Sequence, residues 1–324
     1  MINSTSALSE KIRSRFAYLV LAYEKNTQLI RLLKVIRSAS PDAIILLHFD
    51  AKYEAPDPSH LDALGVELVE PRTSVMWGDI SHVTAVLNSL EYALQRFTFE
   101  WMSVISGQDY PVRPLATIER ELSCSRFDAY VRADPVSEYR SRYYLRYLSL
   151  PNLRIAHRIP LRIRRFFKQA KIQINKRQSL FRFEGGLRGT PFKLGVPRLR
   201  TPFSEKFVCY KGSDWFTLSF QAAGYLAEYS RENASVLEYY RHTIIPSESY
   251  FQTVLYNAGQ LKVCNDNRRF ILWDTANLAH PVVLASQHVE EIVQSNKDFA
   301  RKFDAKVDAG PINRLDEIVV QAAF

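Results

Sequence analysis

The sequence predicts an α/β protein built on a central, mostly parallel β-sheet. Apolar segments of strand length alternate with helical patterns, as is typical of βαβ units. The first unit is the clearest, with an apolar strand over 16–23, apolar residues at helical spacing over 29–36, and a second apolar strand over 43–49. Ligands of such sheets bind beyond the carboxyl ends of the strands, and Asp50 lies at that position.

The alternation of strands and helices continues along the chain. No GxGxxG motif follows the first strand, so the usual dinucleotide site is not predicted. The further elements that we expect are strands over 66–69, 101–106 and 268–273, a turn over 107–111, and helices over 81–95, 287–294 and 312–320. Residues 130–134 close the first half of the chain, and the composition changes after them.

The most informative stretch begins at residue 207. It predicts a short strand over 207–210, a polar turn over 211–214 and a second strand over 215–219. This arrangement sets the carboxylate of Asp214 beside the ring of Trp215. A carboxylate next to an aromatic ring is the kind of surface that holds a sugar.

A second carboxylate, Glu248, follows about thirty residues later. We expect a helix to begin here, with Ser247 as its N-cap and Glu248 in its first turn. The helix dipole alone favours an acidic residue at this position, so the position does not by itself assign a catalytic role. The dipole also lowers the pKa of such a carboxyl, so a general base here needs partial burial to recover basicity.

Two adjacent cations, Arg301 and Lys302, lie in the otherwise apolar segment 299–304, FARKFD. Cations among aromatic residues are rarely left unpaired. A ligand diphosphate is one possible partner, and Asp304 or a carboxylate of a neighbouring helix is the alternative. In a regular strand the two side chains point to opposite faces, so both reach one diphosphate only if the backbone turns there.

The net charge of +9 is concentrated in one segment. Residues 151–206 contain 15 Lys and Arg and two Glu, whereas the rest of the chain contains 28 basic and 32 acidic residues. Within this segment, 161–176 predicts a basic amphipathic helix, which either lies in an anionic membrane interface or packs its apolar stripe on the protein. Residues 185–202 predict a long loop. The local charge favours a docking surface over nucleic-acid binding.

Composition and missing motifs exclude several classes. The three cysteines, Cys124, Cys209 and Cys264, are far apart and form no CxxC pair, so we expect no disulfide framework and a reducing, cytosolic setting. We expect neither a signal peptide nor a membrane span. No DxD or HExxH motif occurs, so no metal site is predicted. Neither a GxSxG motif nor a P-loop occurs. A glycosidase pair of Asp214 and Glu248 stays open, because the sequence does not fix their separation.

Five motifs, in this order, resemble those of the core-2/I-branching glycosyltransferase family, glycosyltransferase family 14. In detail they look closer to the peptide O-xylosyltransferases than to the core-2 N-acetylglucosaminyltransferases, and the segment 140–206 matches neither well. The motifs are SVMWGDIS at 74–81, ISGQDYP at 105–111, GSDWFTLS at 212–219, PSESYFQTVL at 246–255 and FARKFD at 299–304.

The resemblance implies a GT-A type, Rossmann-like nucleotide-sugar-binding fold, a UDP-sugar donor, and inversion at the anomeric carbon without a metal. Glu248 matches the family's general base, which deprotonates the acceptor hydroxyl. A structural role for Asp109 remains an alternative to a ligand contact. The other matching positions are Asp50, Trp77, Arg301 and Lys302 for the donor, and Asp214, Trp215 and Asp109 for the sugar or acceptor.

We therefore expect one large domain over 16–304, with a nucleotide-binding half (16–134), an acceptor or catalytic half (207–304), a basic insert over 140–206 and a C-terminal helix over 305–324. The expected reaction transfers xylose or N-acetylglucosamine from a UDP-sugar to a hydroxyl of a glycan or lipid-linked acceptor, without a cofactor. We expect a cytoplasmic protein whose insert contacts the membrane face, the acceptor or a partner. The alternative is a non-catalytic sugar- or membrane-binding protein on the same scaffold.

Overall fold

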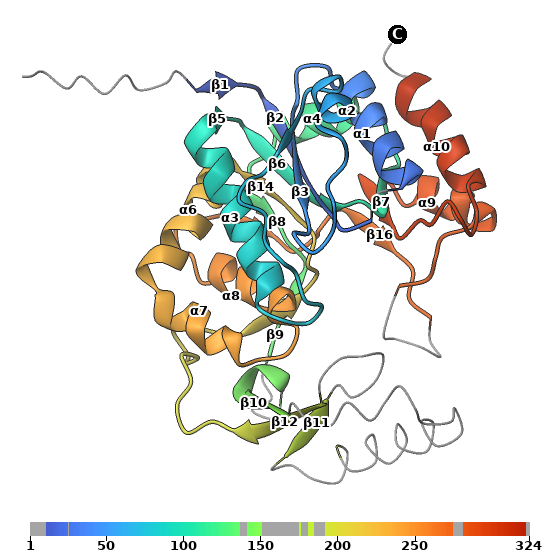
Figure 1. Ribbon diagram of the computed structural model, residues 1–324. Coiled ribbons are helices and arrows are strands. Elements are labelled where there is room, and N and C mark those ends of the chain that lie inside the picture. Colours follow the sequence, from blue (N-terminus) through green and yellow to red (C-terminus); the bar gives the residue numbers. More distant parts are fainter. Residues whose placement is uncertain are drawn as a thin grey trace, which may run out of the picture.

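The computed structural model describes residues 11–24, 26–136, 141–150, 175, 181–184, 192–274 and 281–321. Its centre is a seven-stranded sheet in the order β15-β8-β14-β6-β2-β3-β4 (Figure 1). Neighbouring strands are parallel, except that β14 is antiparallel to both β6 and β8. The predicted α/β class with a mostly parallel sheet is therefore confirmed. The strands are β2 (Phe16–Ala22), β3 (Ile44–Phe49), β4 (Val66–Leu68), β6 (Trp101–Ser106), β8 (Ala129–Tyr130), β14 (Phe216–Ser219) and β15 (Val263–Cys264).

Helices cover both faces of this sheet (Figure 1). In β2, Leu19 and Leu21 belong to the core on one face, whereas Tyr18 and Val20 belong to the core on the other. Side chains alternate between the faces of a strand, so a strand buried on both faces needs an unbroken apolar run. The first face carries α3 (Ser81–Arg96), α6 (Phe220–Glu232), α7 (Ala234–Arg241) and α8 (Tyr250–Tyr256), and the second carries α1 (Thr27–Ala39), α2 (Pro58–Asp62), α4 (Leu115–Ser123), α9 (Val289–Gln294) and α10 (Gly310–Gln321).

A second sheet, in the order β16-β17-β7, joins three distant segments. It consists of β7 (Asp109–Pro111), β16 (Arg269–Ile271) and β17 (Phe299–Arg301). The prediction of a turn over 107–111 is wrong for its last three residues, because their backbone pairs with β17. The C-terminal helix α10 packs against α1 and β7, and the hydroxyl of Tyr110 in β7 donates to Asp316 of α10.

The central stretch differs from its prediction in detail. The first strand is β13 (Tyr210–Gly212), which begins later than expected because it pairs with β9 (Ala133–Pro135). The end of the predicted first half, 130–134, is divided between two strands, since β8 pairs with β14 in the central sheet and β9 pairs with β13. β14 agrees with the predicted second strand to within one residue.

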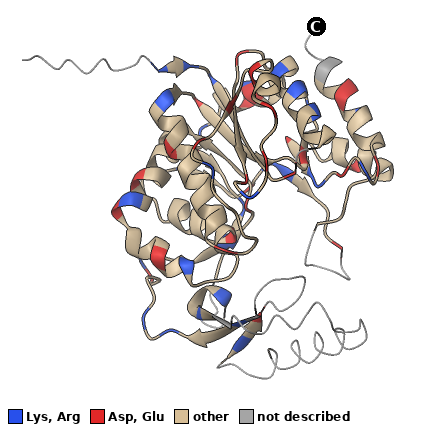
Figure 2. Ribbon diagram, viewed as in Figure 1, with Lys and Arg blue, Asp and Glu red and all other residues tan. Residues whose placement is uncertain are grey.

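Part of the predicted basic insert forms a third, antiparallel sheet of β10 (Leu145–Leu150), β12 (Phe192–Pro197) and β11 (Arg182–Glu184). It lies below the central sheet in Figure 1, and Lys and Arg are found on it in Figure 2. The prediction of a loop over 185–202 is wrong for β12, whose six residues all pair with β10. The helix predicted over 161–176 lies outside the described residues, apart from the helical Asn175. The remaining short strands are β1 (Ile12–Arg13) and β5 (Phe97–Thr98).

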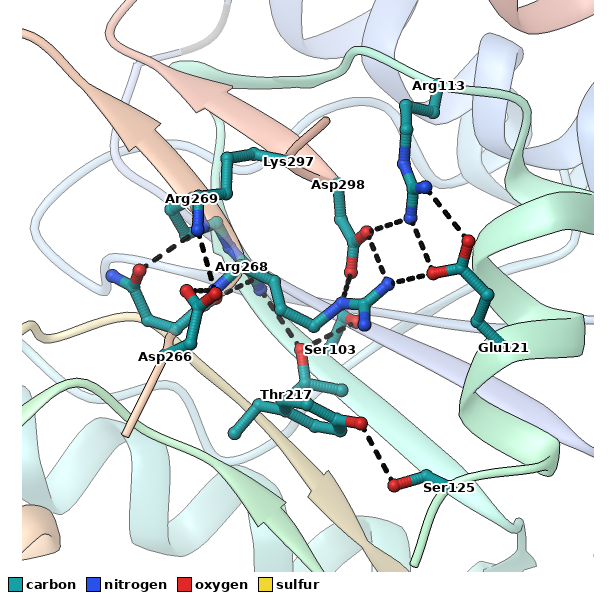
Figure 3. Close-up of polar contacts among 12 residues, drawn as sticks. Ser103, Arg113, Glu121, Ser125, Thr217, Asp266, Arg268, Arg269, Lys297 and Asp298 are labelled. Carbon is teal, nitrogen blue, oxygen red and sulfur yellow. Dashed lines mark hydrogen bonds and ion pairs between the residues drawn. The ribbon is translucent and has the colours of Figure 1, made fainter. Parts of the chain in front are cut away.

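A buried carboxylate fixes the start of β16 and β17 (Figure 3). Asp298, which directly precedes β17, is only 1% exposed and accepts hydrogen bonds from Arg113 at 2.7 Å and from the Nη2 of Arg268 at 2.8 Å. Arg268 directly precedes β16. Both guanidinium groups also bind Glu121 of α4, at 2.8 Å and 2.5 Å. These contacts hold the starts of the two strands next to each other and against α4.

We predict that Asp298→Asn lowers the free energy of unfolding by about 3 kcal/mol, because it removes the buried charge between two guanidinium groups. The matched control is Asp266→Asn, which removes a more exposed carboxylate paired with Lys297 at 2.7 Å and is expected to cost less than about 1 kcal/mol. Urea unfolding of both variants measures the difference. Equal losses contradict a special role for Asp298.

Candidate active site

A cleft of about 910 Å³ opens at the carboxyl ends of β2, β3 and β6. This is the edge at which parallel sheets bind ligands. Every one of the five sequence motifs contributes residues to its wall. The predicted site residues that line it are Asp50, Trp77, Asp214, Trp215, Glu248, Arg301 and Lys302. The cleft therefore brings together all the predicted site residues except Asp109.

Asp50 fastens the loop that carries Trp77. Its Oδ1 accepts hydrogen bonds from the backbone N–H groups of Lys52 (3.0 Å) and Val75 (3.2 Å), and its Oδ2 lies 3.3 Å from the Lys52 ammonium. The ring of Trp77 is 67% exposed at the cleft wall. Asp50 thus acts on the mouth of the cleft through backbone contacts, and Trp77 offers a ring to a ligand.

Arg301 is held from two sides at the end of β17. Its guanidinium carbon lies 4.3 Å from the ring centroid of Trp215, and its Nε lies 3.6 Å from Oδ1 of Asp109. Asp109 is fully buried and also accepts the backbone N–H of Ser106 at 2.7 Å. Asp109 therefore lies behind Arg301 and not on the cleft wall. From this position its carboxylate can hold the guanidinium group of Arg301 in place.

Arg301 retains hydrogen-bonding capacity. Its side chain is 12% exposed, and its Nη1 is buried without a hydrogen-bond partner among the described residues. β17 ends at Arg301, so Lys302 lies beyond the regular strand, and both residues line the cleft. The peptide bond between them is cis. A buried donor that lacks a partner costs free energy, and an anionic ligand in the cleft can supply that partner.

Arg269 of β16 also lines the cleft, although the sequence did not single it out. Its Nη1 donates to the carbonyl of Asn267 at 2.9 Å, and its guanidinium lies over the ring of Phe299 at 4.7 Å. Burial lowers the pKa of Arg269 to about 10, although the charges of Asp298 and Asp109 act in the opposite direction. The sequence does contain a feature that could have indicated Arg269. Two adjacent arginines occur in the apolar segment 268–273, and this pair resembles the Arg-Lys pair of FARKFD.

The predicted helix start at Glu248 is wrong in detail. Pro246–Glu248 form a 3-10 turn (η3), and α8 begins at Tyr250 after Ser249. Ile245 before the turn has a φ of 50°, in the left-handed region, and the proline follows directly. The chain therefore completes a separate turn before the helix, Ser247 is not the N-cap of the helix, and Glu248 lies before the helix and not in its first turn.

Glu248 and Asp214 form a pair of interacting carboxyl groups in the cleft. Burial, followed by the charge of Asp214, raises the pKa of Glu248 to about 7. Burial likewise raises the pKa of Asp214, against the hydrogen bond from Ser247 and the charge of Arg301. A carboxyl group with a pKa near neutrality is suited to general base catalysis. The burial that a base at this position needs is thus present.

Two cleft histidines, His48 and His82, are poor competitors for that role. Burial lowers the pKa of each to about 4. The Nε2 of His48 is already occupied, since it accepts the backbone N–H of Thr73 at 3.0 Å. The ring of His82 packs edge-on against Trp215, with 6.0 Å between centroids. Both side chains therefore remain neutral at physiological pH and serve the shape of the cleft.

Comparison with known proteins places the chain in a family. The Core-2/I-Branching enzyme family matches residues 16–296. The chain belongs to this family. The resemblance inferred from the five motifs is therefore confirmed, and the family segment contains all the predicted site residues except Arg301 and Lys302, which lie just beyond it.

Two similar proteins carry transferase names. The beta-glucuronosyltransferase GlcAT14A of Arabidopsis thaliana is 35% identical over 107 residues, which cover 32% of this chain and 24% of that protein. Xylosyltransferase 1 of Rattus norvegicus is 24% identical over 274 residues, covering 78% of this chain and 28% of that protein. The chain thus spans about a quarter of the length of these relatives.

A solved structure, the 2-C-methyl-D-erythritol 4-phosphate cytidylyltransferase from Thermus thermophilus, matches with a TM-score of 0.29 and 15% identity over 69% of this chain and 84% of that one. A likeness at this level carries no argument about function.

Among the described residues, no three His, Cys, Asp or Glu side chains are grouped so as to hold a metal ion. No helix in the described ranges has both the length and the apolar character of a membrane span.

Proposed function

We propose that the protein is an inverting glycosyltransferase that moves a sugar from a UDP-sugar to a hydroxyl of a glycan or lipid-linked acceptor. One observation carries this proposal. A carboxyl group with a pKa near 7, Glu248, and three cations, Arg269, Arg301 and Lys302, line the same cleft. Family membership supports it further.

In the proposed reaction, Glu248 removes the proton of the acceptor hydroxyl. The electron pair of that O–H bond forms the new bond to the anomeric carbon, on the face opposite the leaving group. The bond from this carbon to the β-phosphate oxygen breaks, and its electron pair leaves with UDP. Asp214 and Trp215, which line the same cleft as Glu248, are proposed to hold the sugar or the acceptor.

The three cations are proposed to stabilise the departing UDP. Negative charge develops on the diphosphate as the sugar leaves, and preplaced donors act most strongly where charge develops. The unsatisfied Nη1 of Arg301 is such a donor. We therefore propose that the reaction needs no metal ion. Trp77 and the loop fastened by Asp50 are proposed to hold the nucleoside.

The donor sugar is proposed to be xylose or N-acetylglucosamine, as the motifs imply. The name of the plant relative adds glucuronic acid to the candidates. Release of UDP from a panel of UDP-sugars, with and without acceptor glycans, identifies the donor. A protein that binds UDP-sugars without releasing UDP from any of them is the non-catalytic alternative.

We predict that Glu248→Gln lowers turnover by about 10² to 10⁴-fold, because the amide accepts no proton, while UDP binding is retained. In the wild-type protein the ionised form is active, so the rate should rise with pH around a midpoint of about 7. UDP release measured over a pH series spanning neutrality checks both statements. The control Glu205→Gln changes an exposed carboxyl outside the cleft. Full activity of Glu248→Gln refutes the assignment of the base.

We predict that the double variant Arg301→Ala and Lys302→Ala loses most of the thermal stabilisation that UDP confers. At a ligand concentration of one hundred times Kd this stabilisation amounts to about 2.7 kcal/mol. Arg314→Ala, which removes an exposed cation of α10, should keep the full effect. Melting curves with and without UDP, repeated in a chelator, provide the measurement. Loss of the wild-type shift in the chelator contradicts metal-independent donor binding.

The basic segment 151–206 is proposed to bring a cytoplasmic protein to the inner face of the membrane. We predict sedimentation with vesicles that contain phosphatidylserine, weakening as salt is added, since each basic residue near an anionic surface contributes about 1 kcal/mol. Vesicles of phosphatidylcholine alone are the control. Replacing Arg164, Arg165 and Lys168 by Gln should reduce binding. Equal binding to both vesicle types, or none to either, removes this part of the proposal.

A further inference from the structure

Arg142 makes a direct contact with the proposed base, although it lies outside all five motifs. It begins η1 (Arg142–Tyr144), the 3-10 turn before β10. Its Nη2 donates to Oε2 of Glu248, and the two side chains are 28% and 31% exposed. The sequence alone assigns this part of the chain to the basic insert. The contact thus links the start of that segment to the cleft.

The position of Arg142 is fixed by its neighbour. Tyr143 is fully buried and belongs to the core shared by α3, α6 and α8. Its carbonyl accepts the hydroxyl of Tyr239 at 2.8 Å, and its ring lies 6.5 Å from that of Tyr240. The backbone of a residue that directly precedes such an anchor has little freedom to move. The fold therefore holds the backbone of Arg142 at a place from which its guanidinium group reaches Glu248.

The charged groups around Glu248 oppose one another. Asp214, in the loop after β13, raises the pKa of Glu248 together with burial, whereas Arg142 of η1 and Lys211 of β13 lower it. Arg301 of β17 acts on Asp214, and Tyr143 lies close enough to feel the charge of Glu248. Of the two cations that act on Glu248 within the described part of the chain, Arg142 is the one that also donates a hydrogen bond to it.

We propose that Arg142 is the positioning residue of Glu248, holding Oε2 so that Oε1 receives the acceptor proton. The same hydrogen bond favours the ionised form of the carboxyl group over the protonated form. This inference rests on the proposed function, in which Glu248 is the base. Arg142 itself touches neither the proton nor the reacting carbon in this scheme. Its loss leaves burial and Asp214 unopposed except by Lys211, so the carboxyl holds its proton to higher pH.

The test compares Arg142→Gln and Arg142→Lys with the control Arg146→Gln. Arg146 is an exposed residue of β10 that does not line the cleft, so the control removes the same charge four positions away. We expect the rising limb of the pH profile of kcat/KM to move upward by about one pH unit in Arg142→Gln, which is about a tenfold loss below the midpoint. Arg142→Lys should lie between, and Arg146→Gln should superimpose on the wild type.

A second measurement does not depend on turnover. In protein labelled with ¹³C in the glutamate carboxyl groups, the Glu248 signal is the one missing from Glu248→Gln. Its titration midpoint should rise in Arg142→Gln and less in Arg142→Lys. If Arg142→Gln does not fold, Arg142→Lys supports both comparisons.

The outcomes separate this inference from the proposed function. An unshifted pH limb and an unshifted carboxyl titration in the Arg142 variants overturn the inference, even if Glu248→Gln is inactive and the proposed function stands. A wild-type protein that transfers no sugar, or a fully active Glu248→Gln variant, overturns the proposed function. In that case a shifted titration still establishes the contact between the two side chains but assigns it no catalytic purpose.

Discussion

The buried carboxylate of Asp298 is the contact on which the cation side of the cleft depends. A buried charge is tolerated only when it is paired and hydrogen-bonded, and here two arginines and Glu121 complete the pairing (Figure 3). Asp298 and Arg268 each precede a strand by one residue. The network therefore determines where β16 and β17 begin, and with them the positions of Arg269 and Arg301.

Those two cations are unfavourable neighbours. Burial lowers the pKa of Arg269, the charges of Asp298 and Asp109 only partly compensate, and the charges of Arg268 and Arg301 add to the lowering. The Nη1 of Arg301 also has no hydrogen-bond partner among the described residues. A site of this kind lowers the stability of the fold until its ligand binds. The satisfied ion pairs around Asp298 and the contact of Asp109 with Arg301 offset that cost and keep the cations in place.

The sequence was sufficient for the features that depend on local pattern. The continuous apolar runs of β2, β3 and β6 specify strands buried on both faces, and their carboxyl ends locate the cleft. Features that depend on distant partners were missed. Asp109 begins a strand because it pairs with Arg301, nearly two hundred positions away, and β12 is a strand because it pairs with β10. Arg142 and Arg269 also depend on distant partners, since Arg142 contacts Glu248 through its side chain and Arg269 lies in a strand that pairs with β17. Composition and periodicity do not reveal such contacts.

The two halves of the proposed site are electrostatically coupled. The charge of Arg301 acts against the burial that raises the pKa of Asp214, and the charge of Asp214 adds to the burial that raises the pKa of Glu248. In the proposed complex, a diphosphate at Arg301 adds negative charge near these carboxyl groups, so each holds a proton more tightly. Glu248 is then a stronger base, but a smaller fraction of it is ionised at neutral pH, and the hydrogen bond from Arg142 opposes this loss. The pH dependence of the proposed reaction therefore depends on both cations, because Arg301 is proposed to receive the leaving group and Arg142 to hold the base.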